Sequence, residues 1–281
     1  MIWLTQCRAS AASRYAALRA SAGWGWLIAA MIFFVGCQSE AEKELAKGDA
    51  AVAEERFDDA VAFYTAAIRS DPQSTAAHLG RGSTYLAQGQ DAKALADFDV
   101  VIEQAPDELP AYAKRGEVYL NLRKLPQAIS DLSRVIDSDV ATWKTYLQRG
   151  KAFSLQNDFD AARGDFSRVI KLNDQFAPAY LLRGKSCLAL REFAEAVTDF
   201  TAAINIDQHY AEAFFHRSIA RLGLGDTKRA EYDRDTAISL DPSFELAVST
   251  WGQNIRDSLD SSGKGEFGGL SPDPNAALRN R

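Results

Sequence analysis

Residues 177–210 read Ala177-Pro-Ala-Tyr-Leu-Leu-Arg-Gly-Lys-Ser-Cys-Leu-Ala-Leu-Arg-Glu-Phe-Ala-Glu-Ala-Val-Thr-Asp-Phe-Thr-Ala-Ala-Ile-Asn-Ile-Asp-Gln-His-Tyr210. Much of this stretch returns when the sequence is shifted by 34 residues in either direction. Self-similarity at a fixed period of this size is typical of stacked supersecondary units, each of which contacts mainly its neighbours. The sequence therefore predicts a repeat array rather than a single closed core.

The repeats begin at six positions, and position 1 of each repeat is its first residue. These first residues are Ala41, Thr75, Leu109, Trp143, Ala177 and Ala211. Each repeat divides into two amphipathic halves separated by residues that favour turns and helix N-caps, such as Gly, Asn and Asp. We expect each half to be a helix of about four turns, which makes the fold class all-α.

Small residues recur at two places in the repeat. Position 8 is occupied by Gly48, Gly82, Gly116, Gly150, Gly184 and Ser218. Position 20 is occupied by Ala60, Ala94, Ala128, Ala162, Ala196 and Ala230. A glycine inside a helix costs about 1 kcal/mol relative to alanine. Its recurrence indicates that the two helices of each repeat approach one another closely.

The complete pattern resembles the tetratricopeptide repeat. It has apolar or aromatic residues at positions 4 and 11, Gly at 8, Ala at 20, an aromatic at 24 and Pro at 32. The resemblance covers residues 41–244 and implies an α-solenoid of six helix pairs that forms a right-handed superhelix. Residues 245–260 continue the phase with Trp251, Gly252 and Ile255, which predicts a C-terminal capping helix.

These patterns predict the following division of the chain. It comprises a leader (1–36), a short tether (37–40), six repeats (41–74, 75–108, 109–142, 143–176, 177–210 and 211–244), the capping helix (245–260) and a tail (261–281). The tail contains too little apolar surface to fold by itself, so we expect it to be flexible.

The N-terminus has the order of features found in a secretory signal. A basic stretch without acids precedes an apolar segment, residues 24–36, that is too short to span a bilayer comfortably. The join Phe34-Val-Gly-Cys37 resembles a bacterial lipoprotein signal, in which the cysteine is acylated and becomes the new N-terminus. This resemblance implies a lipid anchor at Cys37, and Gln38 after it implies the outer membrane. An uncleaved signal anchor and a mitochondrial presequence are the alternatives.

The charge of the body argues against nucleic acid as a partner. The formal net charge of the chain is -6, and the first 36 residues hold three arginines and no acid, so residues 37–281 carry about -9. Proteins that follow the phosphate backbone of nucleic acids normally present a basic face. The cysteines are scattered, and we expect no disulfide framework, metal site or cofactor.

Two opposite charges occur together in repeats 2–6 and are both absent from repeat 1. Position 7 and position 23 hold the pairs Arg81 and Asp97, Arg115 and Asp131, Arg149 and Asp165, Arg183 and Asp199, and Arg217 and Asp233. We interpret them as structural ion pairs across a helix interface, either within a repeat or between neighbouring repeats. The alternative is a row of arginines that binds an acidic ligand.

The resemblance also implies a partner-binding groove, lined by positions 2, 5, 9, 12 and 13 of the first helices. Helical spacing places these positions on one stripe. The candidate groove residues are Leu79, Leu86, Glu117, Leu120, Lys144, Leu147, Lys151, Leu181, Lys185, Leu188, Phe215 and Leu222. They predict an apolar floor that is basic in the middle of the array. The alternative for any one of the apolar residues is that it packs inside the array.

Catalysis is the least supported class of function. The three histidines of the body, His78, His209 and His216, lie at unrelated positions of the repeat, and no nucleophile, phosphate-loop or metal motif is present. The sequence therefore predicts a non-catalytic adaptor that binds peptide or helix segments of other proteins and is tethered at the cell envelope. The alternatives are an array that self-associates and a soluble exported or organellar adaptor.

Overall fold

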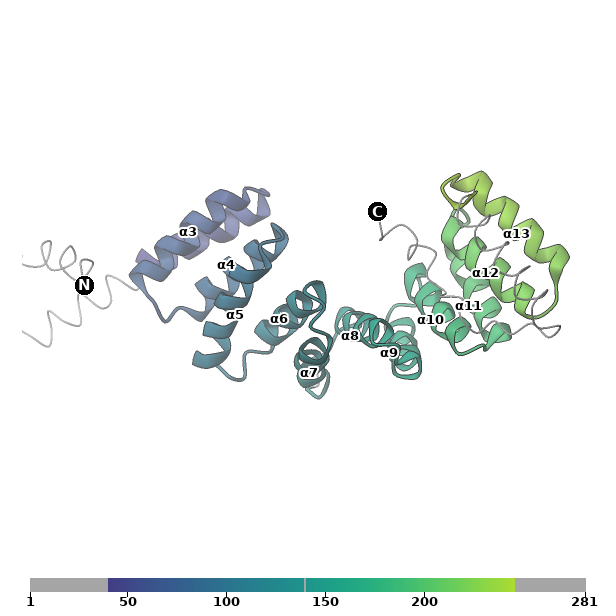
Figure 1. Ribbon diagram of the computed structural model, residues 1–281. Coiled ribbons are helices and arrows are strands. Elements are labelled where there is room, and N and C mark those ends of the chain that lie inside the picture. Colours follow the sequence, from purple (N-terminus) through teal and green to yellow (C-terminus); the bar gives the residue numbers. More distant parts are fainter. Residues whose placement is uncertain (1–39, 139, 246–281) are drawn as a thin grey trace, which may run out of the picture. The chain divides into compact units, whose positions relative to one another are not determined.

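The computed structural model describes residues 40–138 and 140–245, which are helical apart from the connecting turns and contain no strand (Figure 1). The chain divides into two compact units, Met1–Ala111 and Tyr112–Arg281, and each is described by itself. The expected all-α solenoid of paired helices is confirmed. The predicted leader with Cys37, almost all of the capping helix and the tail lie outside the described residues.

The helices follow one another in pairs joined by short turns. In the first unit, residues 40–53 are helical and are followed by α3 (Phe57–Ser70), α4 (Thr75–Ala87) and α5 (Asp91–Gln104). Helix α6 (Leu109–Asn121) begins at the end of this unit and continues into the second. The remaining helices are α7 (Leu125–Ile136), α8 (Trp143–Leu155), α9 (Phe159–Leu172), α10 (Ala177–Ala189), α11 (Phe193–Ile206), α12 (Ala211–Gly223) and α13 (Thr227–Leu240).

Local chemistry explains where the second helices start. The carboxylates of Asp158 and Asp226 cap α9 and α13 by accepting hydrogen bonds from the backbone N–H groups of Ala161 and Arg229. Pro126 lies in the first turn of α7, where its missing N–H has no helical partner to lose. The turn residues of the sequence therefore mark these helix starts.

Each first helix ends in a residue with a left-handed backbone at position 15. This residue is Gly89 or Gly225 in two repeats, Asn157 in a third, and Glu55, Arg123 and Arg191 in the others. The next N–H then bonds back to the carbonyl of position 11, as from Asp158 to Phe153 (2.9 Å), which satisfies the end of the helix. The tight turn brings the second helix back along the first.

A proline is not needed to stop a second helix. Helix α5 ends at Gln104, just before Pro106, and α9 ends at the same position of its repeat, Leu172, without a proline. Helix α7 is the exception because it ends at Ile136, two residues earlier in the repeat. At this end the Ser138 hydroxyl donates to the backbone carbonyl of Val135 over 2.6 Å, which satisfies one of the last carbonyls of the helix.

The recurrent glycine lets the two helices of a repeat touch. A Cβ added at Gly150 would lie 2.8 Å from Cε1 of Phe166, and an added Cβ at Gly184 would lie 2.7 Å from the same atom of Phe200. The other glycines at position 8 face the position-24 side chain in the same way: Gly48 with Tyr64, Gly82 with Phe98 and Gly116 with Leu132. All five position-24 side chains are buried, so each repeat closes around this contact.

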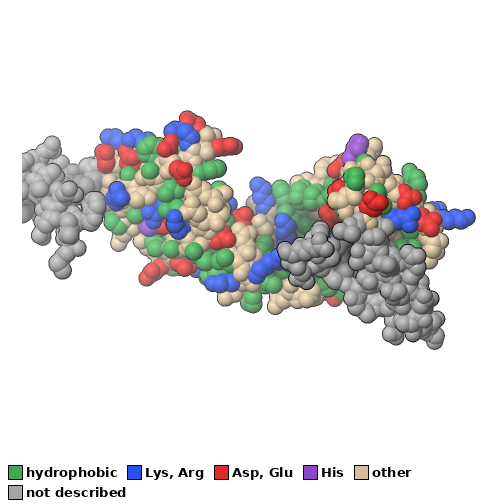
Figure 2. All heavy atoms as spheres, turned by 45° about the horizontal axis from the view of Figure 1, so that its top comes forward, with side chains coloured by type: hydrophobic (Ala, Val, Ile, Leu, Met, Phe, Trp, Pro, Cys, Tyr) green, Lys and Arg blue, Asp and Glu red, His purple; other side chains and the backbone are tan. Residues whose placement is uncertain are grey.

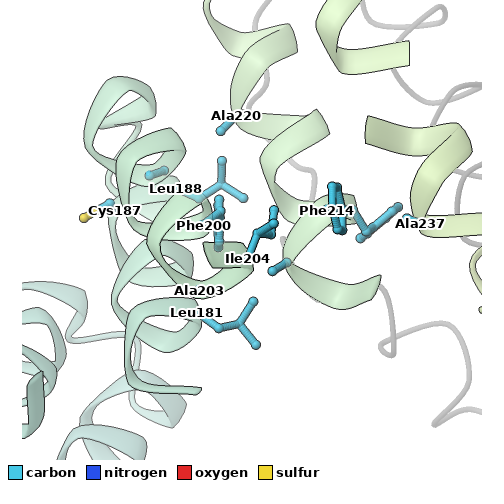
Figure 3. Packing of buried hydrophobic residues seen from close by; sticks show 12 residues of the cluster. Leu181, Cys187, Leu188, Phe200, Ala203, Ile204, Phe214, Ala220 and Ala237 are labelled. Atoms are coloured by element: carbon cyan, nitrogen blue, oxygen red, sulfur yellow. The ribbon is translucent and has the colours of Figure 1, made fainter. Parts of the chain in front are cut away.

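The buried clusters are built from these contacts and from the helices of neighbouring repeats. In the second unit, Phe200 packs with Leu181, Leu188, Ile204 and Phe214 in a cluster shared by α10, α11 and α12 (Figure 3). A fully buried aromatic side chain contributes about 1.5–3 kcal/mol relative to an exposed one. Stability is therefore spread along the array rather than held in one centre.

Two glycines of the fourth repeat provide a matched test of the close approach. We expect Gly150→Ala to destabilise the protein by about 1–3 kcal/mol, because the new methyl group overlaps the ring of Phe166. Gly164 lies inside α9 with no atom within 4 Å of its added Cβ. Gly164→Ala should therefore stabilise by up to about 1 kcal/mol. Urea unfolding measures both, and the same sign of change for the two variants would contradict the packing argument.

Candidate partner-binding site

Each arginine at position 7 forms two hydrogen bonds with the aspartate at position 23 of the same repeat. Arg149 donates from Nε to Asp165 Oδ2 and from Nη2 to Asp165 Oδ1, both over 2.8 Å. The four other pairs use the same atoms over 2.6–3.0 Å: Arg81 and Asp97, Arg115 and Asp131, Arg183 and Asp199, and Arg217 and Asp233. The pairs therefore join the two helices within one repeat.

The same arginine also reaches the preceding repeat. Arg149 Nη1 donates to Ser133 Oγ on α7 over 3.0 Å, so one guanidinium joins three helices. Equivalent bonds run from Arg81 to Thr65, from Arg183 to Ser167 and from Arg217 to Thr201. The sequence interpretation missed these hydroxyl residues, although they recur at position 25 with the same period of 34 residues.

The buried charges of these pairs are stabilised by one another. Hydrogen bonding to Asp165 raises the pKa of the Arg149 guanidinium above its usual value. Burial opposes ionisation of Asp97, but the hydrogen bonds from Arg81 and His78 outweigh it and lower the pKa of that carboxyl. His78 Nδ1 lies 2.9 Å from Asp97 Oδ1. The charges are thus satisfied inside the fold, which supports the structural interpretation over an acidic-ligand site.

Four of the predicted groove residues are buried, and their assignment to the groove floor is wrong. Leu181, Leu188 and Phe215 are only 3%, 6% and 1% exposed because they pack in the cluster around Phe200. Leu147, which is 9% exposed, packs against Phe166 and Val169 in a second cluster. These side chains hold neighbouring repeats together, which is the alternative that the sequence left open.

The other predicted groove residues are partly or fully exposed. Leu79 and Leu86 lie on α4 in the first unit, and both are partly exposed. In the second unit Lys144 on α8 is exposed. Five further residues are partly exposed: Glu117 and Leu120 on α6, Lys151 on α8, Lys185 on α10 and Leu222 on α12. We call the positions 2, 5, 9, 12 and 13 of the first helices the first-helix face. On the face of the molecule that Figure 2 shows, basic, acidic and apolar side chains are interspersed.

Most charges on the first-helix face of the second unit are paired. Glu117 lies 3.5 Å from Lys114, and Lys185 Nζ lies 3.1 Å from Glu212 Oε1. His216 Nε2 lies 3.6 Å from the same Glu212 oxygen. The adjacent His216 imidazole, together with Lys185, outweighs burial and lowers the pKa of Glu212 to about 2. Lys185 is therefore largely neutralised by its neighbour.

The described residues provide no metal cluster of three or more His, Cys, Asp or Glu side chains. Cys187 is buried, and burial raises the pKa of its thiol to about 11. A thiol in that state is a poor nucleophile, and Cys187 instead packs in the buried cluster around Phe200. None of the helices in residues 40–138 and 140–245 combines the length and apolar content needed to cross a membrane.

Paired helices, a close glycine contact and a row of buried ion pairs define an α-solenoid of two-helix repeats. The family model described as "Tetratricopeptide repeat" matches residues 45–108 and 147–211. These two stretches, which fall within the repeats read from the sequence, therefore resemble tetratricopeptide repeats. Proteins built from these repeats generally bind other proteins or peptides and are typically non-catalytic.

Solved structures share this fold. YrrB, described as a TPR protein with an unusual peptide-binding site, is 19% identical with a TM-score of 0.61 and covers 67% of this chain and 97% of its own. PilW, described as a widely conserved type IV pilus biogenesis factor, is 17% identical with a TM-score of 0.63. The match covers 72% of this chain and 94% of PilW. MamA is 20% identical with a TM-score of 0.57, and the match covers 62% of this chain and 96% of MamA. No curated protein sequence matches the chain.

The structural role of the arginines can be separated from a ligand-binding role. We expect Arg149→Ala to destabilise the protein by about 3–5 kcal/mol, because it leaves the buried Asp165 carboxylate without its partner. Arg168→Ala, on the exposed face of α9, is the matched control and should change stability by less than about 0.5 kcal/mol. Thermal and urea unfolding measure the effect. Unchanged unfolding with lost partner binding would instead make Arg149 a ligand residue.

Proposed function

We propose that this protein is a non-catalytic adaptor, tethered to the cell envelope by a lipid on Cys37, that binds segments of partner proteins on the first-helix face. The observation that carries the proposal is that this face keeps exposed polar and apolar side chains while the arginines and aspartates are consumed inside the fold. The peptide-binding site described for YrrB supports a binding role for the same type of array.

The membrane tether rests on the sequence of the N-terminus. A basic stretch, an apolar segment and a small residue before Cys37 match the order expected for a lipoprotein signal. Several acyl chains on one residue would hold the body at a membrane without a spanning helix. The helix of residues 40–53 follows Cys37 closely, and extended chain covers at most about 3.6 Å per residue. The first repeat would then lie within roughly 15 Å of the membrane surface.

Metabolic labelling with a lipid analogue tests the tether. In a bacterial host we expect the wild-type protein to take up the label and fractionate with membranes, because Cys37 is acylated after signal processing. Cys37→Ser should lose the label, whereas Cys7→Ser should keep it, since residue 7 lies in the cleaved leader. A Cys37→Ser protein that is still labelled contradicts the proposed anchor.

Cross-linking in the native envelope tests the binding face. Leu120, on the first-helix face of α6, is partly exposed. We expect Leu120→Glu to reduce the recovery of cross-linked partner by at least about tenfold, because a charge replaces an apolar contact. The matched control is Leu122→Glu, two residues further along at the exposed turn (39% exposed), with circular dichroism to verify the fold.

Equal recovery of partner by the Leu120→Glu and Leu122→Glu proteins would reject the first-helix face as the binding site. If the cross-linked species recovered by the wild type consists only of further copies of this chain, the face is instead an interface for self-association. Size exclusion of the Leu120→Glu protein would then show a smaller species than the wild type.

A further inference from the structure

Two lysines lie on the same side of α8 without an acidic partner among the described residues. Lys144 is exposed and Lys151 is partly exposed. They are seven residues apart, which is two helical turns and about 10.5 Å along the helix. The ammonium of Lys144 lies 5.7 Å from the centre of the Trp143 ring, which holds that side chain near the surface of α8.

The neighbouring first helices do not neutralise these two charges. On α6 the carboxylate of Glu117 is engaged by Lys114 over 3.5 Å. On α10 and α12 the carboxylate of Glu212 is engaged by Lys185 over 3.1 Å, with His216 nearby. Lys185, the third lysine predicted for the middle of the groove, is therefore already paired with Glu212. The uncompensated positive charge of the first-helix face in the second unit is concentrated on α8.

Apolar contacts contribute little at this point of the face. Leu147 lies between the two lysines in sequence but is buried at 9% exposure, and Gln148 beside it is polar. Leu155, one turn beyond Lys151, is 40% exposed. A partner at α8 would therefore gain its affinity mainly from charged hydrogen bonds, with an apolar contact at one end only.

We infer that α8 binds an acidic segment of a partner protein, whose two carboxylates lie about 10 Å apart and pair with Lys144 and Lys151. A peptide in the polyproline II conformation provides this distance with two acids three residues apart, since it has three residues per turn and advances by about 3.1 Å per residue, so that both acids lie on the same side. A helical segment provides it with acids seven residues apart. The inference rests on the proposed function, because it assumes that the first-helix face is the binding surface.

The acidic body selects a short acidic segment over a uniformly acidic partner. Residues 37–281 carry about -9 in total, which repels anions at long range. Screening at physiological ionic strength limits this repulsion to about 8 Å, whereas direct pairs with the lysines persist at closer range. Added salt should then weaken binding, because the attractive pairs dominate the interaction.

Labelled synthetic peptides test the inference with the full-length protein in detergent. Each twelve-residue peptide carries two glutamates at a different spacing in a neutral background, with a matched peptide in which glutamine replaces both. We expect fluorescence anisotropy to show the tightest binding at a spacing of three residues or seven. The matched glutamine peptide should bind at least tenfold more weakly.

Charge-neutral variants then locate the binding. The double variant Lys144→Gln with Lys151→Gln should weaken binding of the glutamate peptide at least tenfold. Lys171→Gln with Lys228→Gln, at exposed positions of α9 and α13, removes the same charge from second helices and should leave the affinity within twofold. Glutamate peptides that bind no better than glutamine peptides overturn the inference, as does equal loss in the two double variants.

The outcome can be separated from failure of the proposed function. If Leu120→Glu abolishes partner recovery while the α8 double variant has no effect on it, the adaptor function stands and the acidic partner is rejected. If neither variant affects partner recovery, the proposed function itself fails. A decamer of thymidine that binds more tightly than every glutamate peptide, and is lost in the α8 double variant, overturns the inference in favour of nucleic acid.

Discussion

The close approach of the two helices within each repeat is the constraint on which the rest of the structure depends. A Cβ at Gly150 would stand 2.8 Å from the Phe166 ring, closer than real Cβ contacts come, so only glycine permits this separation. The sixth repeat has the exception that clarifies the rule. There Ser218 replaces the glycine, and position 24 is Arg234 instead of a ring. The glycine at position 8 and the large apolar side chain at position 24, an aromatic ring in four repeats and Leu132 in the third, thus form the two halves of one contact.

The arginine at position 7 joins neighbouring repeats within each of the two units. Its Nε and Nη2 atoms bind the aspartate of its own repeat, and in four repeats Nη1 binds a hydroxyl of the preceding one. In the sixth repeat the aspartate has a second partner, since Asp233 also accepts a hydrogen bond from Arg221 over 2.7 Å. Buried ion pairs contribute little net stability. Their fixed geometry instead favours one register between adjacent helices.

The sequence predicted the fold well because its determinants repeat. Glycine at position 8, alanine at position 20 and the charges at positions 7 and 23 each recur, and recurrence separates them from chance. Position 25 carried a weaker periodic signal, with Thr65, Ser133, Ser167 and Thr201 in four of the six repeats, and single hydroxyls are common on helices. The residues of the groove were harder to predict, because the exposure of Leu181 or Leu188 depends on which side chains of the next repeat pack against them. Helical spacing gives only the direction of a side chain.

In the proposed adaptor, partner selection depends on the positions that differ between repeats. Contacts made identically in every repeat hold the array together but cannot distinguish one part of it from another. Position 2 changes from Glu42 through Pro110 to Lys144, and position 9 from Asp49 to Lys151. Only in the fourth repeat are both of these positions lysine. Because the leucine beneath them is buried, this repeat offers a partner charge rather than apolar surface, in a body whose overall charge is negative. Such a local reversal of sign favours specificity through electrostatic complementarity more than it favours high affinity.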